Sequence, residues 1–136
     1  LDMVLVNNDT NSIEIRHGFY RFFKTPVTYE NKGSPISIAA GDVNHDSNLD
    51  LVVVNRDADS VSVLIGDGHG AFSLLFNDTV GSQPYAVVLA DLNNDTHLDI
   101  VVVNGGNGSV AILFGQGDGE FPRQKQYQTG SSPRSL

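Results

Sequence analysis

The chain has 136 residues, 40% of them hydrophobic, and its 16 acidic against 8 basic side chains give a formal net charge of -8. This composition supports one folded core and excludes nucleic acid or an anionic membrane surface as the main partner, because both require a positive face. The absence of cysteine excludes disulfides and thiolate chemistry, and no apolar stretch reaches the roughly 18 residues that membrane insertion needs.

Residues 1–41 are predicted to be a partial, degenerate copy of a repeat that recurs later in the chain. The opening "LDMVLVN" at 1–7 matches "LDLVVVN" at 49–55, whereas "RHGFYRFFKT" at 16–25 replaces a glycine-rich turn. Four aromatic residues cluster there: Phe19, Tyr20, Phe22 and Phe23. They form either an exposed aromatic and basic binding patch or packing between neighbouring repeats. We favour packing, which is what most aromatic clusters do.

The next stretch is predicted to contain four β-strands separated by polar and glycine-rich turns. The strands are expected at 35–41, 50–55, 60–66 and 71–77. "DLVVVN" at 50–55 is a continuous β-branched run, which is typical of a strand buried on both faces. No segment shows a helical period with caps, so the fold class is all-β, with four antiparallel strands per repeat, as in a β-propeller blade.

The pattern then repeats with a period of 49 residues. "DVNHDSNLDLVVVN" begins at Asp42 and "DLNNDTHLDIVVVN" at Asp91, and Gly66 and Pro84 recur as Gly115 and Pro133 with the same spacing. We therefore divide the chain into a degenerate copy (1–41), a full copy (42–90) and a truncated copy (91–136). About 2.8 repeats are present, which predicts a fragment of a larger propeller.

Each of the two complete motifs predicts a metal-binding loop. Oxygen-bearing side chains occupy positions 1, 3, 5 and 9 of both loops, and position 7 can supply a backbone carbonyl. The predicted ligands are Asp42, Asn44, Asp46, Asn48 and Asp50 in one loop and Asp91, Asn93, Asp95, His97 and Asp99 in the other. Hard oxygen ligands at alternate positions suit Ca²⁺, which takes six to eight oxygens. Three carboxylates so close together also favour a neutralising cation.

Two alternatives compete with this interpretation. An EF-hand has Gly at position 6 and Glu at position 12, but this chain has Ser47 or Thr96 and then Val53 or Val102. A polar turn closed by Asx hydrogen bonds is the other alternative. Two copies with the same spacing, and Asp2 as the remnant of a third, favour the metal loop.

These residues resemble the FG-GAP/VCBS repeat family, the blades of integrin-alpha-like β-propellers. The resemblance rests on "DVNHDSNLDLVVVNRDADSVSVLIGDGHGAF" and "DLNNDTHLDIVVVNGGNGSVAILFGQGDGEF". It implies that each loop joins two strands of a blade and binds calcium through the residues named above. It also implies a ring of about seven blades, so further blades would flank this segment. The glycine that the family has at position 6 is missing from both loops.

The sequence predicts no catalytic and no organic-cofactor-binding residue. His17, His45, His69 and His97 do not fall into an H-x-x-x-H or H-E-x-x-H motif, and no G-x-S-x-G is present. "GDGHG" and "GQGDG" are followed by neither a helix nor a lysine, so they are interpreted as turns and not as phosphate loops. The chain is therefore not expected to be an enzyme.

The expected function is an extracellular module in which calcium is a structural metal and the propeller surface binds a protein or a glycan. Two other functions remain open: a non-catalytic scaffold within a larger secreted enzyme, and a structural spacer. Three N-x-S/T sequons outside the metal loops, at Asn8, Asn77 and Asn107, would permit glycosylation in a secreted protein.

Overall fold

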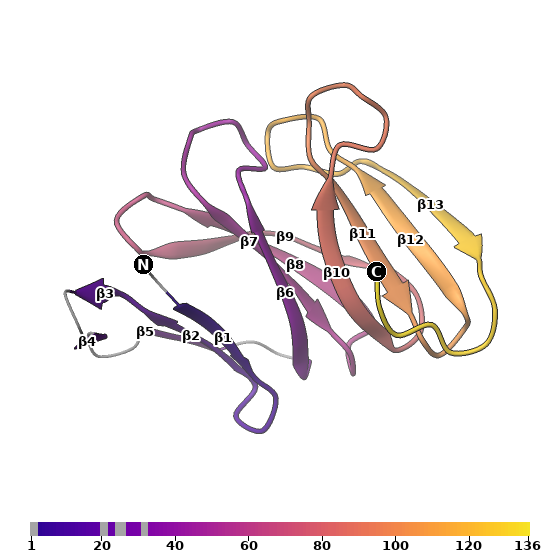
Figure 1. Ribbon diagram of the computed structural model, residues 1–136, viewed down its shortest axis with the longest axis horizontal. Coiled ribbons are helices and arrows are strands. Elements are labelled where there is room, and N and C mark those ends of the chain that lie inside the picture. Colours follow the sequence, from indigo (N-terminus) through magenta and orange to yellow (C-terminus); the bar gives the residue numbers. More distant parts are fainter. Residues whose placement is uncertain (1–2, 20–21, 24–26, 31–32) are drawn as a thin grey trace.

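The computed structural model describes residues 3–19, 22–23, 27–30 and 33–136, and within these residues every regular element is a β-strand (Figure 1). The strands form three antiparallel sheets of three or four strands and one two-stranded ribbon. The predicted all-β class with antiparallel four-stranded units is therefore confirmed. Among the described residues there is no helix with the length and hydropathy that a membrane crossing requires.

The first sheet pairs β1 (Met3–Asn7), β2 (Ser12–Arg16) and β5 (Val27–Glu30) in that order. A short two-stranded ribbon of β3 (Gly18–Phe19) and β4 (Phe22–Phe23) lies between β2 and β5 in the sequence. The predicted aromatic cluster coincides with this ribbon, but its side chains lie outside the described part of the chain. The choice between a binding patch and packing therefore stays a prediction.

The second and third sheets have the same four-stranded order. The second contains β6 (Pro35–Gly41), β7 (Asp50–Asn55), β8 (Ser60–Gly66) and β9 (Phe72–Thr79). The third contains β10 (Pro84–Ala90), β11 (Asp99–Asn104), β12 (Ser109–Phe114) and β13 (Arg123–Gln128). The first three predicted strands of the full repeat coincide with β6, β7 and β8, whereas the fourth is shifted from 71–77 to 72–79. In both sheets the first strand precedes the metal-loop motif in the sequence, so each loop connects the first two strands of one sheet.

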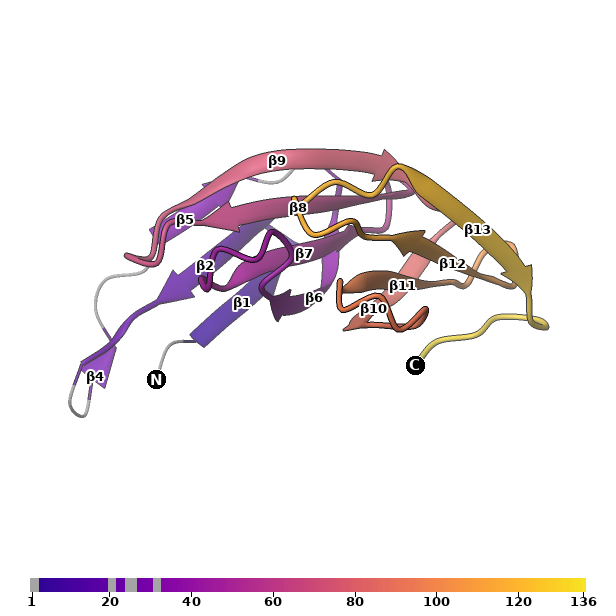
Figure 2. The ribbon, with the colours of Figure 1, turned by 90° about the horizontal axis from the view of Figure 1, so that it is seen from above.

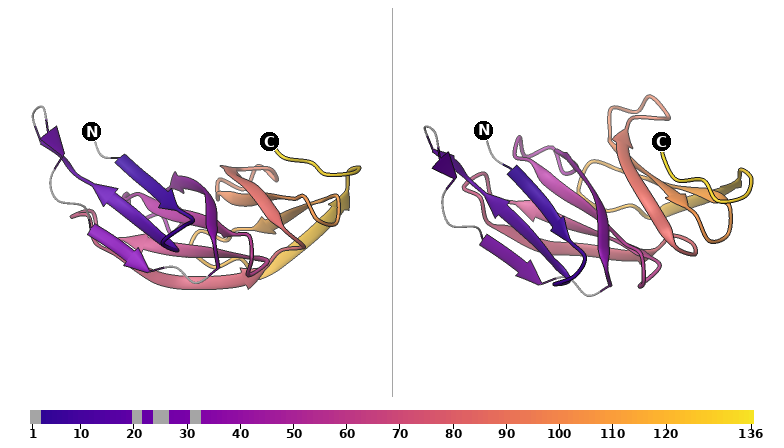
Figure 3. Two further views of the ribbon diagram at one scale, coloured as in Figure 1. Left: turned by 90° about the horizontal axis from the view of Figure 1, so that it is seen from below. Right: turned by 60° about the horizontal axis from the view of Figure 1, so that its bottom comes forward.

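The three large sheets stand side by side along an arc (Figure 2). Strands β5, β9 and β13 follow its convex side, and β6 and β10 lie on its concave side, as Figure 3 also shows. The backbone N–H of Val87 on β10 donates a hydrogen bond to Ser37 Oγ on β6, at 3.3 Å, so the innermost strands of adjacent sheets are in direct contact.

The hydrophobic core lies between the sheets. Strand β7 is buried along its whole length and presents alternate residues to two clusters. Leu51 and Val53 pack with Ile13 and Ile15 of the first sheet. Val52 and Val54 belong to a second cluster, which includes Ile100, Val102, Ala111 and Leu113 of the third sheet. The prediction of a strand buried on both faces is thus confirmed, and each sheet depends on its neighbour for burial.

Apolar residues at equivalent positions of the two loops differ in burial. Val43 at position 2 of the first loop is 2% exposed because the third sheet covers it, whereas Leu92 at the same position of the second loop is 50% exposed. Leu98 at position 8 contacts the region of Gly41 on β6, while its counterpart Leu49 is 64% exposed. Val43 is therefore buried where the third sheet is adjacent, whereas Leu49 is exposed although it lies beside the first sheet, whose described part has three strands.

Because the core is shared between sheets, we expect Leu113→Ala to lower the free energy of unfolding by about 3 kcal/mol, since it removes a fully buried side chain. Leu74→Ala on β9, where the side chain is 65% exposed, is the matched control and should change it by less than about 0.5 kcal/mol. Chemical denaturation measures both. Equal effects of the two substitutions would contradict the shared core.

Candidate metal centre

The two predicted metal loops project from the same end of the sheets (Figure 1). Residues 42–50 connect β6 to β7, and residues 91–99 connect β10 to β11. The strand registers close the loops in the same way, because Gly41 pairs with Asp50 and Ala90 pairs with Asp99. The two loops can therefore be compared position by position.

The carboxylate at position 9 anchors each loop to its sheet. Asp50 is fully buried, and its two oxygens accept hydrogen bonds from the backbone N–H groups of Val43 and Gly66, both at 2.9 Å. Asp99 is also fully buried and accepts from the N–H groups of Leu92 and Gly115, both at 3.0 Å. Burial raises the pKa of Asp50, and the two N–H donors oppose that rise.

The carboxylate at position 1 closes the turn. One oxygen of Asp42 accepts from the N–H of Asp46 at 3.1 Å, and the other from the N–H of Ser47 at 2.9 Å. Asp91 accepts from the N–H groups of Asp95 and Thr96 at the same distances. These are Asx-type contacts, the geometry expected of a polar turn, and they leave carboxylate lone pairs free for further ligands.

The side chains at positions 3 and 5 are bonded to each other. The Asn44 amide donates to Asp46 Oδ2 at 2.9 Å, and the Asn93 amide donates to Asp95 Oδ2 at 2.7 Å. The Asn44 hydrogen bond is the main cause of a lowered pKa at Asp46, and the His97 N–H is the main cause of a lowered pKa at Asp95. Both exposed carboxylates are therefore ionised at neutral pH.

The backbone takes the left-handed conformation at positions 4 and 6 of both loops. The φ angles are 60° and 67° at His45 and Ser47, and 60° and 73° at Asn94 and Thr96. His and Asn tolerate this region comparatively well, whereas a β-branched Thr is a steric outlier there. The glycine of the family pattern is thus absent from a position whose backbone conformation glycine fits best.

Glycine turns of the same sheet cover the position-7 side chains. A Cβ on Gly68 would collide with the Asn48 amide, and a Cβ on Gly117 would collide with the His97 ring. The His97 ring also lies 4.9 Å from the His45 ring, centroid to centroid, and the N–H of Gly119 donates to the Val43 carbonyl at 3.1 Å. The His45–His97 contact joins the two loops, and the Gly119 hydrogen bond joins the first loop to the third sheet. Neither was predicted, because no local pattern pairs residues of adjacent repeats.

The residue types fit a hard divalent cation, but carboxylates alone do not form the site. Among the described residues, no group of three or more Asp, Glu, His or Cys side chains is arranged to hold a metal ion. Positions 1, 3 and 5 are brought together, whereas position 9 directs both oxygens to backbone N–H groups. A calcium ion would therefore need asparagine and backbone oxygens as well, which it accepts. Asp2, the predicted remnant of a third loop, lies outside the described residues.

The repeated antiparallel sheets with their loops define a β-propeller-type repeat module. Residues 42–102 match the family model of the FG-GAP-like repeat. The resemblance inferred from the sequence is thereby confirmed, and the repeat implies that the sheets are propeller blades. Searches among curated proteins and among solved structures gave no significant match.

The left-handed backbone at position 6 leads to a prediction. Thr96→Gly should raise the free energy of unfolding by about 0.5–1 kcal/mol, because relief of the steric conflict outweighs the greater entropy that glycine loses on folding. Ser47→Gly should act in the same direction. Ser73→Gly, in the exposed part of β9, is the control and should lower stability by about 0.5–1 kcal/mol. Thermal or urea unfolding measures these changes. If Thr96→Gly proved as destabilising as Ser73→Gly, Thr96 would not be sterically strained in the left-handed conformation.

Proposed function

We propose that the chain is a calcium-binding β-propeller module of an extracellular protein, that calcium acts as a structural metal, and that the propeller surface binds a protein or glycan. The observation that carries this proposal is the agreement between the two loops. Positions 1, 3, 5 and 9 have the same residue types and the same hydrogen-bond partners in both loops, and positions 4 and 6 share the left-handed backbone. A polar turn alone does not require the same residue types at positions 1, 3 and 5, whose side chains are not buried.

The negative charge of the two loops supports the binding of a cation. Asp42 and Asp46 in the first loop and Asp91 and Asp95 in the second are close carboxylates. Among the described residues, none of them takes part in an ion pair. A bound calcium ion would supply positive charge and oxygen coordination. The protein would hold it through Asp42, Asn44 and Asp46, or through the equivalent residues of the second loop, together with a position-7 carbonyl.

The position-9 carboxylate explains how the loops would act on the fold. Asp50 and Asp99 are the first residues of β7 and β11, the central buried strands. Each also holds the end of the following strand through the N–H of Gly66 or Gly115. Fixing the loop would thus fix the start of the central strand and the end of β8 or β12. This role is structural, and we propose no catalysis for the module.

An extracellular location suits sites of this kind. Extracellular modules bind calcium with dissociation constants of about 10⁻⁴–10⁻³ M, and millimolar calcium outside cells fills such sites. The strain at Ser47 and Thr96 is compatible with weak sites. The exposed Leu92, whose counterpart Val43 is buried against the third sheet, favours a further blade of the same propeller beside the third sheet.

Calcium titration tests this proposal. We expect calcium to raise the melting temperature of the wild-type protein, and the double substitution Asp91→Asn with Asp95→Asn to reduce that rise and abolish one binding event. Both side chains are exposed, so the variant should fold without calcium. Asp78→Asn, an exposed aspartate on β9, is the control and should behave as wild type.

Calorimetric titration and differential scanning calorimetry measure these effects. The absence of both binding heat and a calcium-dependent stabilisation in the wild-type protein would refute the proposal. A response of the double variant equal to that of the wild type would refute the assignment to the second loop.

A further inference from the structure

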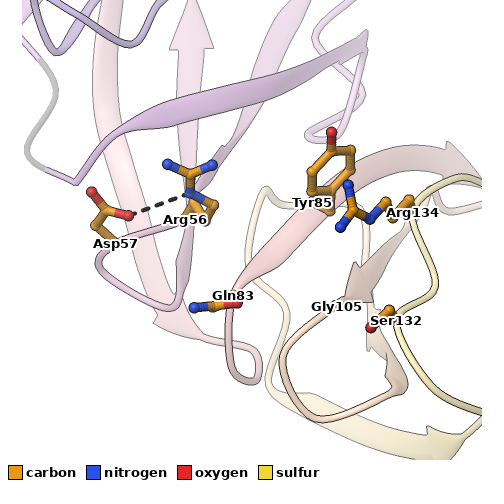
Figure 4. A pocket seen from close by; sticks show the side chains of 7 residues that line it. All are labelled: Arg56, Asp57, Gln83, Tyr85, Gly105, Ser132 and Arg134. Atoms are coloured by element: carbon orange, nitrogen blue, oxygen red, sulfur yellow. Dashed lines mark hydrogen bonds and ion pairs between the residues drawn. The ribbon is translucent and has the colours of Figure 1, made fainter.

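A polar pocket of about 400 Å³ lies between the second and third sheets (Figure 4). Its walls are the turn after β7, the residues at the start of β10 and the segment after β13, and its principal side chains are Arg56, Asp57, Gln83, Tyr85, Ser132 and Arg134. The calcium loops lie at the other end of these strands, because Gln83 precedes β10 and Asp91 follows it. The pocket volume is in the lower part of the range for small-molecule sites.

Two guanidinium groups border the pocket in a protein whose net charge is -8. Arg56 and Asp57 lie on one side, with Arg56 Nε 3.4 Å from Asp57 Oδ1. Arg134 lies on the other side, with its guanidinium carbon 5.5 Å from the centre of the Tyr85 ring. No ion pair of Arg134 occurs within the described residues. The lining therefore carries a net charge of about +1, which suits a monoanion.

The remaining lining side chains are neutral groups that are capable of hydrogen bonding. Gln83 supplies a side-chain amide, and Tyr85 and Ser132 supply hydroxyl groups, all of which can donate and accept. The backbone N–H of Gln83 is bonded to Asp59 Oδ1 at 2.7 Å, which fixes this wall of the pocket. Among the described residues, no large apolar side chain apart from the Tyr85 ring lines the pocket, so a hydrophobic anchor of a peptide would find no partner there.

The pocket chemistry is not a consequence of the repeat. The left-handed backbone before proline recurs at Ser34, Gln83 and Ser132, so it belongs to the start of every repeat. The side chains do not recur: the residues at the positions of Arg56 and Tyr85 in the preceding copy are Asn8 and Ile36. Arg56 and Tyr85 therefore occur together only at the gap between the second and third sheets.

We propose that this pocket binds a sugar that carries one carboxylate, such as a uronic acid unit of a glycan. Arginine binds planar carboxylates through paired N–H donors, and Arg56 and Arg134 approach the pocket from two sides. Gln83, Tyr85 and Ser132 supply partners for the sugar hydroxyls. A phosphate dianion is disfavoured because Asp57 already offsets one of the two positive charges. The site is distant from the calcium loops, so its occupancy does not depend on calcium.

Nuclear magnetic resonance titration of the whole chain with glucuronate, in calcium-free buffer, tests this site. We expect shifts of the Arg56 and Arg134 Nε–H and Gln83 side-chain resonances, with binding on the order of millimolar, as for a small ligand in an open site. Glucose should bind at least about tenfold more weakly, as expected when a charge-assisted hydrogen bond is lost.

Arg134→Gln and Arg56→Gln should each weaken glucuronate binding about tenfold for the same reason. Arg123→Gln removes an equal charge at the start of β13, where Arg123 lies over the Phe114 ring, and should leave binding unchanged. Arg134 is exposed and Arg56 half-exposed, so both pocket variants should keep the wild-type spectrum outside the pocket.

Each remaining outcome would overturn the proposal. The absence of glucuronate shifts, or equal binding of glucose, would show that no carboxylate site exists. Equal binding of acetate would reduce the site to a general anion site, and tighter binding of glucose 6-phosphate would make it a phosphate site. Tighter binding of an acidic peptide than of glucuronate would assign the pocket to a protein partner. None of these outcomes bears on calcium binding at the loops.

Discussion

The structure depends on one repeated interaction, a fully buried carboxylate at the start of the central strand of a sheet. Asp50 and Asp99 each accept two backbone N–H groups, one from the loop before the strand and one from the end of the next strand. A buried carboxylate without such partners would cost several kcal/mol. With them, it holds three segments of the sheet together and fixes the loop above it.

The shared core extends this constraint from one sheet to the next. Strand β7 contributes Leu51 and Val53 to one cluster and Val52 and Val54 to the other, so the second sheet is needed by both of its neighbours. The ring contact between His45 and His97 continues this coupling at the loop end. At the other end, the gap between two sheets forms the pocket near Arg56 and Arg134. The residues that repeat thus form the scaffold, and the residues that differ between repeats determine the chemistry of the pocket.

Much of this architecture could be predicted from the sequence. The β-branched run at 50–55 and its copy at 99–104 identified the buried central strands, and the fixed period identified the repeating sheets. The alternate polar residues of the loops identified the candidate ligands. The sequence could not show that Asp50 and Asp99 turn both oxygens to backbone N–H groups, since those donors are distant in the chain. Nor could it show the pocket, whose residues come from several turns brought together only by the packing of adjacent sheets.

The most direct test of the account is a crystal structure of the protein grown with calcium, with anomalous scattering used to locate the ions. The account predicts one ion in each loop, 42–50 and 91–99, bound to oxygens of positions 1, 3 and 5 and the position-7 carbonyl at about 2.3–2.6 Å. The buried carboxylates should keep their hydrogen bonds to Gly66 and Gly115. Ordered loops without an anomalous peak, or calcium bound only elsewhere, would contradict the account.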